Sequence, residues 1–303
     1  MPQTDHTPML NALHKPFPSF IAPSNLVKIL ALFAALSQSG IFLAAGDAID
    51  PASGNAVPSV PEIASQGYKL AFSDEFRGPK LDEDKWQYRI DSKGQSTQLP
   101  ANVTVSNGLH IAVKKEDSRG KKYTAGGVIT KAELKYGYYE ARFRAPPGSG
   151  FHTSFYAEQW NGKDTGVTLG REEIDICEED SKTGATKIGY LFTVHDWGSM
   201  YPAGSRALGP KSGSLPWAEQ DRAKPYSNGP ALCKDFHVWG MEFTPTVVRF
   251  YFDGEWKGSI DATGFAHTPM NVFLTTIGWA GTIDDSQLPS EAQFDYFRFF
   301  TKP

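Results

Sequence analysis

The chain has 303 residues, of which 30 are basic and 34 are acidic, so its formal net charge is −4 at pH 7. This balance provides no global basic surface for nucleic-acid phosphates, and we expect no nucleic-acid partner. Hydrophobic residues make up 40% of the chain, which is enough to fill a core and excludes a disordered chain. Two cysteines cannot build a small disulfide scaffold, so packing must supply most of the stability.

The N-terminal segment contains an interrupted apolar run over residues 29–45, directly after Lys28. The run is too short and too broken to span a bilayer, and the small residues Ala44 and Gly46 suit a signal-peptidase site. We interpret residues 1–46 as a leader, which predicts a secreted or periplasmic protein with no membrane partner beyond export. A later methionine as the start and a retained N-terminal anchor are the alternatives.

The segment after the leader is rich in Ala, Ser, Gly and Pro, and we predict a linker over residues 47–66. Residues 67–303 then remain. A chain of this size still forms one domain in an all-β sandwich, so we expect a single domain there.

From Tyr68 onward, short runs of alternating or β-branched residues are separated by turn residues. The pairs Asn107-Gly108 and Asp253-Gly254 lie between such runs, and these dipeptides supply the positive φ angles of two-residue hairpin turns. No long window has a period of 3.6 and no unit of 20 to 50 residues recurs, which disfavours helical bundles, βαβ folds and solenoids. We predict an all-β fold, a sandwich of two antiparallel sheets.

The segment over residues 171–180, REEIDICEED, is rich in acidic side chains. In a regular strand Glu173 and Asp175 share one face, whereas Glu178 falls on the other. A β-bulge at residues 176–177 adds one residue and returns Glu178 to the side of the other two acids. We therefore predict a bulged strand that gathers three acids in one groove.

Such an arrangement suits the cleavage of glycosidic bonds. Two Glu side chains that lean toward each other from this spacing can bring their carboxyl groups to about 5 Å, the separation found in retaining glycosidases. Like charges push the two pKa values apart, which would keep one Glu protonated and the other ionised, while Asp175 between them holds a proton by a hydrogen bond. An exposed acidic strand or a calcium cluster is the alternative, because acidic surface runs are common.

EIDICE, residues 173–178, resembles the longer, bulged form of the signature of family 16 glycoside hydrolases. That signature is Glu, an aliphatic residue, Asp, an aliphatic residue, an optional further residue, and Glu. LAFSDEF at residues 70–76 resembles the opening strand of the family, and FDYFRFF at residues 294–300 resembles its closing strand. The resemblance covers about residues 67–302.

The resemblance implies that residues 67–303 form a catalytic domain with a concanavalin A-like jelly roll and a cleft on the concave sheet. It implies retaining cleavage inside β-linked polysaccharides, with Glu173 as nucleophile, Asp175 as its helper and Glu178 as general acid/base. We expect a monomer whose partner is its polysaccharide substrate and that requires no cofactor. A transglycosylase that uses the same residues and a non-catalytic carbohydrate-binding sandwich are the alternatives.

The sugar preference stays open. FHTSFY at residues 151–156 departs from the Trp-Pro-Ala-Phe-Trp-like stretch of laminarin-cleaving and lichenan-cleaving members, and its Thr-Ser-Phe-Tyr part is closer to agarase-like members. The candidate substrates are a β-1,3-glucan, a mixed β-1,3/1,4-glucan and a β-linked galactan such as agar.

Several further side chains are candidates for substrate binding. We expect His195 and Trp197 beside the groove, one strand after the acids, where a His donor and a Trp platform suit a sugar ring; a structural His is the alternative. Aromatic residues of a sandwich are more often part of the core, and the weaker candidates of this kind are Tyr156, Trp160, Trp217 and Trp279. Arg171 is a candidate contact for an anionic sugar, with a surface charge as the alternative.

Two features concern metals and cysteines. The family resemblance implies that Asp295 helps to bind a structural calcium ion, with backbone oxygens near Gly108 as partners. Cys177 and Cys233 are either two buried thiols or one disulfide, and the sequence does not decide between them.

Overall fold

The computed structural model describes residues 56–160, 172–180, 190–196, 231–263, 267–279 and 281–303. The predicted leader over residues 1–46 lies outside these ranges, as do Arg171, Trp197 and Trp217. No helix within them is both long and apolar enough to cross a membrane.

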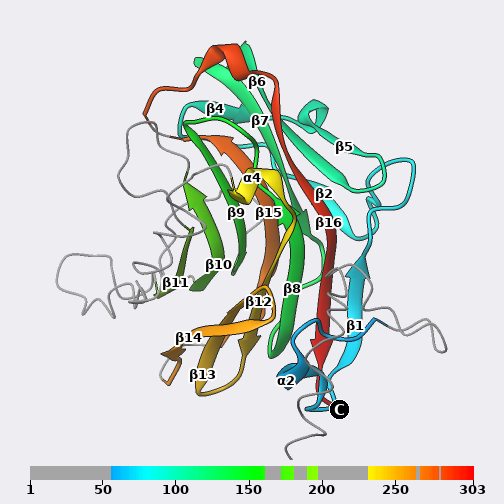
Figure 1. Ribbon diagram of the computed structural model, residues 1–303. Helices are drawn as coiled ribbons and strands as arrows, with labels where there is room; N and C mark the ends of the chain where they lie inside the picture. Colours follow the sequence, from blue (N-terminus) through cyan, green and yellow to red (C-terminus); the bar gives the residue numbers. More distant parts are fainter. Residues whose placement is uncertain (1–55, 161–171, 181–189, 197–230, 264–266, 280) are drawn as a thin grey trace, which may run out of the picture. The chain divides into compact units, whose positions relative to one another are not determined.

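The described residues form sixteen strands and four single helical turns (Figure 1). The first eight strands are β1 Lys69–Asp74, β2 Trp86–Tyr88, β3 Ser92–Lys93, β4 Ser96–Gln98, β5 Val103–Val105, β6 Leu109–Ser118, β7 Lys121–Thr130 and β8 Gly137–Arg144. The others are β9 Phe151–Glu158, β10 Glu172–Asp180, β11 Tyr190–Asp196, β12 His237–Phe243, β13 Val247–Phe252, β14 Glu255–Asp261, β15 Asn271–Gly278 and β16 Ser290–Thr301. The helical turns are α2 Pro61–Ala64, α4 Ala231–Lys234, η1 Pro100–Asn102 and η2 Asp285–Gln287.

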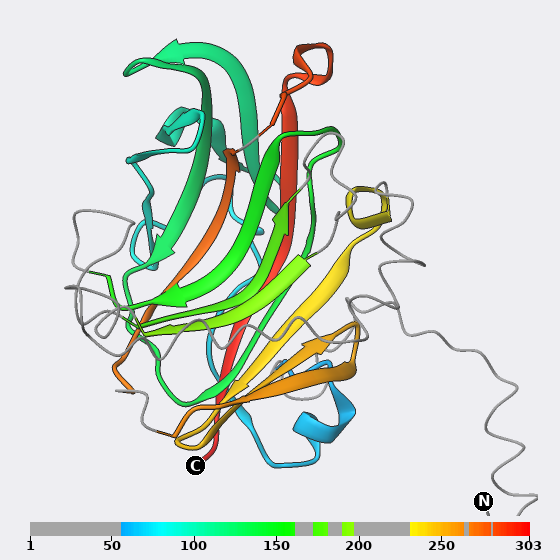
Figure 2. The ribbon, with the colours of Figure 1, turned by 90° about the vertical axis from the view of Figure 1, so that its left-hand side faces the viewer.

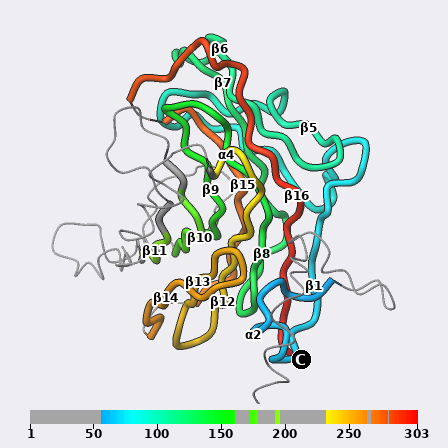
Figure 3. Tube along the Cα trace, in the orientation of Figure 1, coloured from blue at the N-terminus to red at the C-terminus, as the bar shows by residue number. Residues whose placement is uncertain are grey.

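The strands are arranged in two layers. The front sheet has the order β11-β10-β9-β15-β7-β2, and in Figure 2 its strands β9, β10 and β11 lie side by side. The back sheet has the order β6-β16-β8-β12-β13-β14, with β1 on β16 and β5 on β6. The β6–β7 hairpin joins the layers, as the chain trace in Figure 3 shows, because β6 pairs with β16 and β7 pairs with β15.

The pairings are antiparallel except that of the short β4 with β7, which is parallel. The prediction of an all-β sandwich of antiparallel sheets is therefore confirmed. The two Asx-Gly turns also have the backbone that was expected, since Asn107 and Asp253 both take positive φ angles.

The main core fills the space between the two sheets. Side chains of the front sheet contact the back sheet directly: the rings of Phe192 and Phe250 stack at 4.2 Å, and those of Phe155 and Phe297 meet edge to face at 5.9 Å. Aromatic pairs of this kind add to the free energy that apolar burial provides. The front sheet is thus fixed from behind, and its other face carries the polar residues discussed below.

The prediction of a linker over residues 47–66 is wrong for residues 56–66, the part that the structure describes. The α2 turn begins with Pro61, which suits the first position of a helix, and Ile63 is fully buried. Ile63 and Val60 belong to an apolar cluster with Tyr138 and Tyr251 of the back sheet. Apolar side chains within a Pro- and Ser-rich stretch anchor it, so the folded unit begins before residue 67.

No disulfide joins the two cysteines. Cys177 is buried in the core, whereas Cys233 lies within α4 and is partly exposed. Of the two alternatives left open by the sequence, the structure has the two separate thiols.

Candidate active site

The strand β10 has a β-bulge between its first two acids and its third. Against β9, Asp175 lies opposite Tyr156, whereas Cys177 lies opposite Phe155, so Ile176 has no partner of its own. The register against β11 shifts in the same interval. The predicted bulge is therefore confirmed at residues 176–177.

The bulge turns two consecutive side chains into the core. Ile176 and Cys177 are both buried there, as is Ile174. Glu173, Asp175 and Glu178 consequently occupy the opposite face of the front sheet, and the charges of Glu173 and Glu178 both act on Asp175. One strand thus supplies all three acids.

Asp175 is the central acid and is only 2% exposed. Burial raises the pKa of Asp175 well above its usual range, and the negative charges of Glu178 and Glu173 raise it further against the opposing effect of Lys93. The Nε2 atom of His195 lies 3.0 Å from its Oδ2 atom. Among these acids, Asp175 is therefore a carboxyl group whose tendency to keep a proton is increased by its surroundings.

Glu178 has the opposite tendency. Burial by itself would raise the pKa of Glu178, but a hydrogen bond from His152 and the positive charges of His152, His195 and Lys93 outweigh burial and lower it. The Nε2 atom of His152 lies 3.1 Å from the Oε1 atom of Glu178. The pKa of Glu178 is thus lowered whereas that of Asp175 is raised, which differs from the expectation that the Glu acting as acid is the group kept protonated.

His195 lies where the sequence predicted it. It faces Glu173 in the β10–β11 pair and contacts Asp175, and its side chain is 17% exposed. Its predicted neighbour Trp197 lies outside the described residues.

The aromatic candidates differ in their surroundings. Tyr156 is only 5% exposed; its ring stacks on Phe273 at 4.5 Å, and Trp160 meets Phe273 edge to face. Trp279 follows β15, and its indole lies 5.2 Å from the ring of His152, which in turn contacts Glu178. Tyr156 lies opposite Asp175 in the β9–β10 pair and is packed into the sheet surface.

Two nitrogen-bearing side chains near the acids, His152 and Lys93, were not singled out from the sequence. Strand alternation places His152 on the same face as Tyr156. Lys93, in β3, lies with its Nζ atom 5.9 Å from the centre of the Trp279 ring and makes no ion pair or hydrogen bond with the described residues. No local pattern indicates Lys93, because β3 reaches the acids only through the tertiary fold.

The surroundings of Asp295 do not fit the expected calcium ion. Its Oδ1 atom accepts a hydrogen bond from Arg77 at 2.7 Å and its Oδ2 atom one from Arg142 at 2.6 Å. Both carboxylate oxygens thus face guanidinium groups, which repel a divalent cation. Among the described residues, no group of three or more His, Cys, Asp or Glu side chains could hold a metal ion. We derive no role for calcium.

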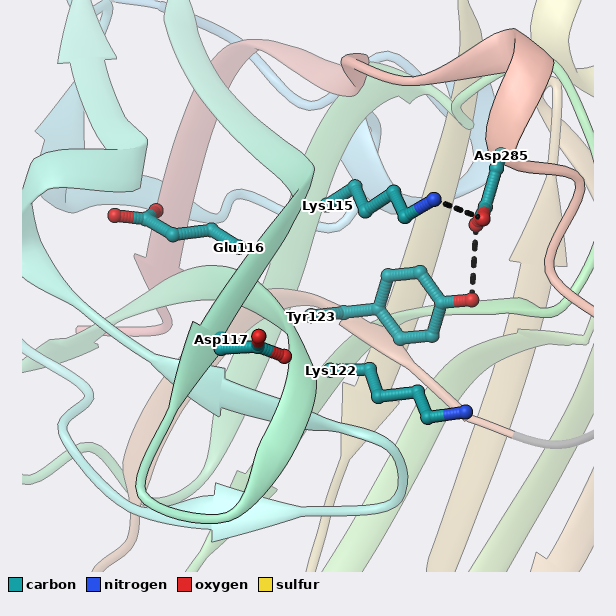
Figure 4. Close-up of a pocket in the computed structure, with 6 residues that line it drawn as sticks. All are labelled: Lys115, Glu116, Asp117, Lys122, Tyr123 and Asp285. Atoms are coloured by element: carbon teal, nitrogen blue, oxygen red, sulfur yellow. Dashed lines mark hydrogen bonds and ion pairs between the residues drawn. The ribbon is translucent and has the colours of Figure 1, made fainter.

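A recess of about 470 Å³ lies away from the acids, at the end of the β6–β7 hairpin. Figure 4 shows Lys115 and Tyr123 directed at Asp285 of η2, and Glu116 and Asp117 on the other side of the hairpin. The Lys115 Nζ atom is 2.7 Å from Asp285, and the Tyr123 hydroxyl donates to the same carboxylate at 2.9 Å. Tyr123 is buried, so its ring has no exposed face on which a ligand could stack. We therefore interpret the contacts of Lys115 and Tyr123 with Asp285 as structural contacts that hold η2 in place.

The arrangement on β10 defines a class of protein. An Asp between two Glu side chains on one face of a sheet is an arrangement that can supply the pair of carboxyl groups that glycosidases use. The fold and the site together are those of a carboxylate-dependent glycosidase.

Comparison with known proteins gives the family. Residues 69–296 match the family model described as beta-porphyranase A-D, GH16 domain. The chain therefore belongs to glycoside hydrolase family 16, whose members are O-glycosyl hydrolases with a jelly-roll fold.

Individual relatives agree with this assignment. Beta-porphyranase E of Zobellia galactanivorans is 25% identical over 76% of this chain and 86% of its own length. Kappa-carrageenase of Pseudoalteromonas carrageenovora is 27% identical over 71% of this chain, which spans only 57% of that protein. The laminarinase catalytic domain of Thermotoga maritima superposes with a TM-score of 0.61 at 23% identity over 78% of this chain and 99% of that one, which shows a shared fold.

Proposed function

We propose that this protein is a retaining endo-glycosidase that hydrolyses internal β-glycosidic bonds of a polysaccharide. Glu173 is the nucleophile, Glu178 the general acid/base, and Asp175 the proton-holding helper between them. The bulge at residues 176–177 carries this proposal, because it alone brings Glu178 to the face of the other two acids.

The reaction has two steps with one covalent intermediate. The Glu173 carboxylate attacks the anomeric carbon while the Glu178 carboxyl gives its proton to the departing glycosidic oxygen. Glu178 then removes a proton from water, the water oxygen bonds to the anomeric carbon, and the ester to Glu173 breaks. A protonated Asp175 carries no negative charge, so it adds no electrostatic repulsion to the carboxylate of Glu173. A transglycosylase would differ only in that a sugar hydroxyl replaces the water.

A β-linked galactan is the substrate class that we favour over a β-glucan. The matching family model is one of porphyranases, and two of the relatives are named for porphyran and carrageenan. The Thr-Ser-Phe-Tyr stretch at residues 153–156 points in the same direction. Because polysaccharides are too large to enter a cell, the proposal includes export through the leader over residues 1–46, and we propose that the enzyme acts as a monomer.

The test combines variants with a substrate panel. We expect Glu173→Ala and Glu178→Ala each to reduce turnover by at least about a hundredfold, since the first removes the nucleophile that forms the covalent intermediate and the second a general acid–base group, which contributes that much or more. The exposed residue Glu133 provides the control variant Glu133→Ala, which should keep full activity. The measurement is the release of reducing ends from porphyran, agarose, kappa-carrageenan, laminarin and lichenan.

Two results would contradict the proposal. Unchanged turnover in either Glu variant would remove its assigned role. If no polysaccharide of the panel is cleaved but one of them binds, the protein is the non-catalytic carbohydrate-binding sandwich instead.

A further inference from the structure

His152 is held beside the third acid by its place in the sheet. In the β9–β10 pair Ser154 lies opposite Glu178, and His152 lies opposite Asp180, so His152 is the diagonal neighbour of Glu178. Diagonal side chains on one face of a sheet are within reach of each other when they are long. The distance of 3.1 Å between His152 Nε2 and Glu178 Oε1 shows that they meet.

The orientation of the His152 ring is fixed on its other side. The ring packs against the indole of Trp279, with 5.2 Å between the centroids, and the His152 side chain is 13% exposed. Its Nδ1 atom is buried and has no hydrogen-bond partner in the described part of the protein. Nε2 is thus the ring nitrogen that donates to Glu178, and a hydrogen on Nε2 is present both in the imidazolium and in one of the two neutral tautomers.

This contact uses one of the two carboxylate oxygens of Glu178. Oε1 accepts from His152, so the second oxygen, Oε2, is left for the glycosidic oxygen or the attacking water. A carboxylate that is held by one oxygen presents the other in a defined direction, which proton transfer requires.

We propose, on the basis of the function proposed above, that His152 is the positioning residue of Glu178: through Nε2 it holds one oxygen of the acid/base carboxylate and so orients the other toward the scissile bond. His152 itself does not contact the reacting atoms. It acts only through Glu178.

The charges that face Glu178 agree with this role. They come from His152 on β9, His195 on β11, Lys93 on β3 and Asp175 on β10 itself. His152 is the one among them that hydrogen-bonds to Glu178, and after the opposing effect of burial it contributes most to the lowered pKa of Glu178. Glu178 must take up a proton before the first step, so activity is lost as the pH rises above the pKa of Glu178. Because His152 lowers this pKa, the alkaline limb of the pH profile lies at a lower pH than it would without His152.

The experiment compares two substitutions at position 152. His152→Phe keeps a ring against Trp279 but removes the donor, and His152→Gln keeps a neutral donor. In His152→Phe we expect the pKa of Glu178 and the alkaline limb of kcat/KM to rise by about one pH unit, as is typical for the loss of such a partner. In His152→Gln the rise of the Glu178 pKa should be smaller. In His152→Phe, kcat should also fall about tenfold, because the carboxylate of Glu178 is no longer oriented.

Two measurements are made on each variant. One is the pH profile of kcat and kcat/KM on porphyran, or on whichever polysaccharide of the panel is cleaved fastest. The other is the ¹³C shift of the Glu178 carboxyl against pH in the substrate-free protein, assigned with Glu178→Gln. The matched control is His110→Gln, because His110 pairs with Glu291 at 3.0 Å on the back sheet; neither readout should change.

The outcomes separate the inference from the proposed function. If kcat/KM falls equally at every pH and the pKa of Glu178 is unchanged in both His152 variants, His152 is only structural and the inference is overturned. Activity that persists in Glu178→Ala overturns the proposed function, while the carboxyl titration still decides whether His152 controls the ionisation of Glu178. A urea-unfolding curve of each variant verifies that it is folded.

Discussion

At the scale of single residues, neighbouring strands give chemically similar carboxyl groups opposite properties. Asp175 is enclosed by the sheet and by two other acids, which raises its pKa, whereas Glu178 is met by His152, which lowers its pKa. Asp175 therefore binds a proton more tightly than Glu178 does. Two carboxyl groups whose pKa values are pushed apart by their surroundings are a frequent feature of acid–base sites.

The raised pKa of Asp175 predicts a pH-dependent stability difference. A folded state that keeps the proton loses stability as the pH rises from the unfolded pKa, about 4, to the folded pKa. The Asp175→Asn variant has no titrating group at this position. The difference between its free energy of unfolding and that of the wild type should therefore increase over this pH range and then level off. Urea unfolding between pH 4 and pH 8 measures this, with Asp235→Asn at an exposed position as the control. A difference that does not vary with pH would contradict the assignment of the proton to Asp175.

At the scale of elements, one extra residue in β10 has two consequences. It lets Ile176 and Cys177 point consecutively into the core, and it restores Glu178 to the face of Asp175. Bulges are frequent next to active sites because they redirect a side chain without breaking the sheet.

Deletion of Ile176 should remove the bulge and still leave the three acids on one face. In the shortened strand Glu173, Asp175 and Glu178 alternate regularly with Ile174 and Cys177, so Glu178 stays on the face of Asp175. We expect part of the turnover to remain, while the loss of the buried Ile176 side chain lowers the free energy of unfolding by about 2–4 kcal/mol, as judged by reducing-end release and urea unfolding. Ile176→Val, which keeps the bulge, should cost only about 1 kcal/mol and remain active. Complete loss of turnover in a folded deletion variant would show that the bulge itself, and not only the shared face, is required.

At the scale of the whole folded unit, residues before position 67 belong to the structure. Val60 and Ile63 pack under α2 against the tyrosines of the back sheet, and both the backbone nitrogen and the hydroxyl of Ser59 donate to the buried carboxyl of Glu140. The back sheet is thus covered on its outer face by the segment that precedes its first strand.

Ile63→Ala tests this anchoring. Ile63 is fully buried, so we expect its truncation to lower the free energy of unfolding by about 2–4 kcal/mol, the usual cost of a cavity of this size. Val57, which is 43% exposed, provides the control variant Val57→Ala. Equal unfolding midpoints for the two variants would mean that the segment is not part of the folded unit.

The sequence by itself determined the strand alternation, the Asx-Gly turns and the position of the bulge, because these depend on residues close together along the chain. It therefore also indicated Glu173, Asp175 and Glu178, and His195 one strand away. It did not reveal Lys93 or the contact of His152 with Glu178, and it misjudged residues 56–66 and Asp295. Those features arise where strands distant in sequence are brought into register, so only the tertiary structure decided which charge meets which carboxyl group.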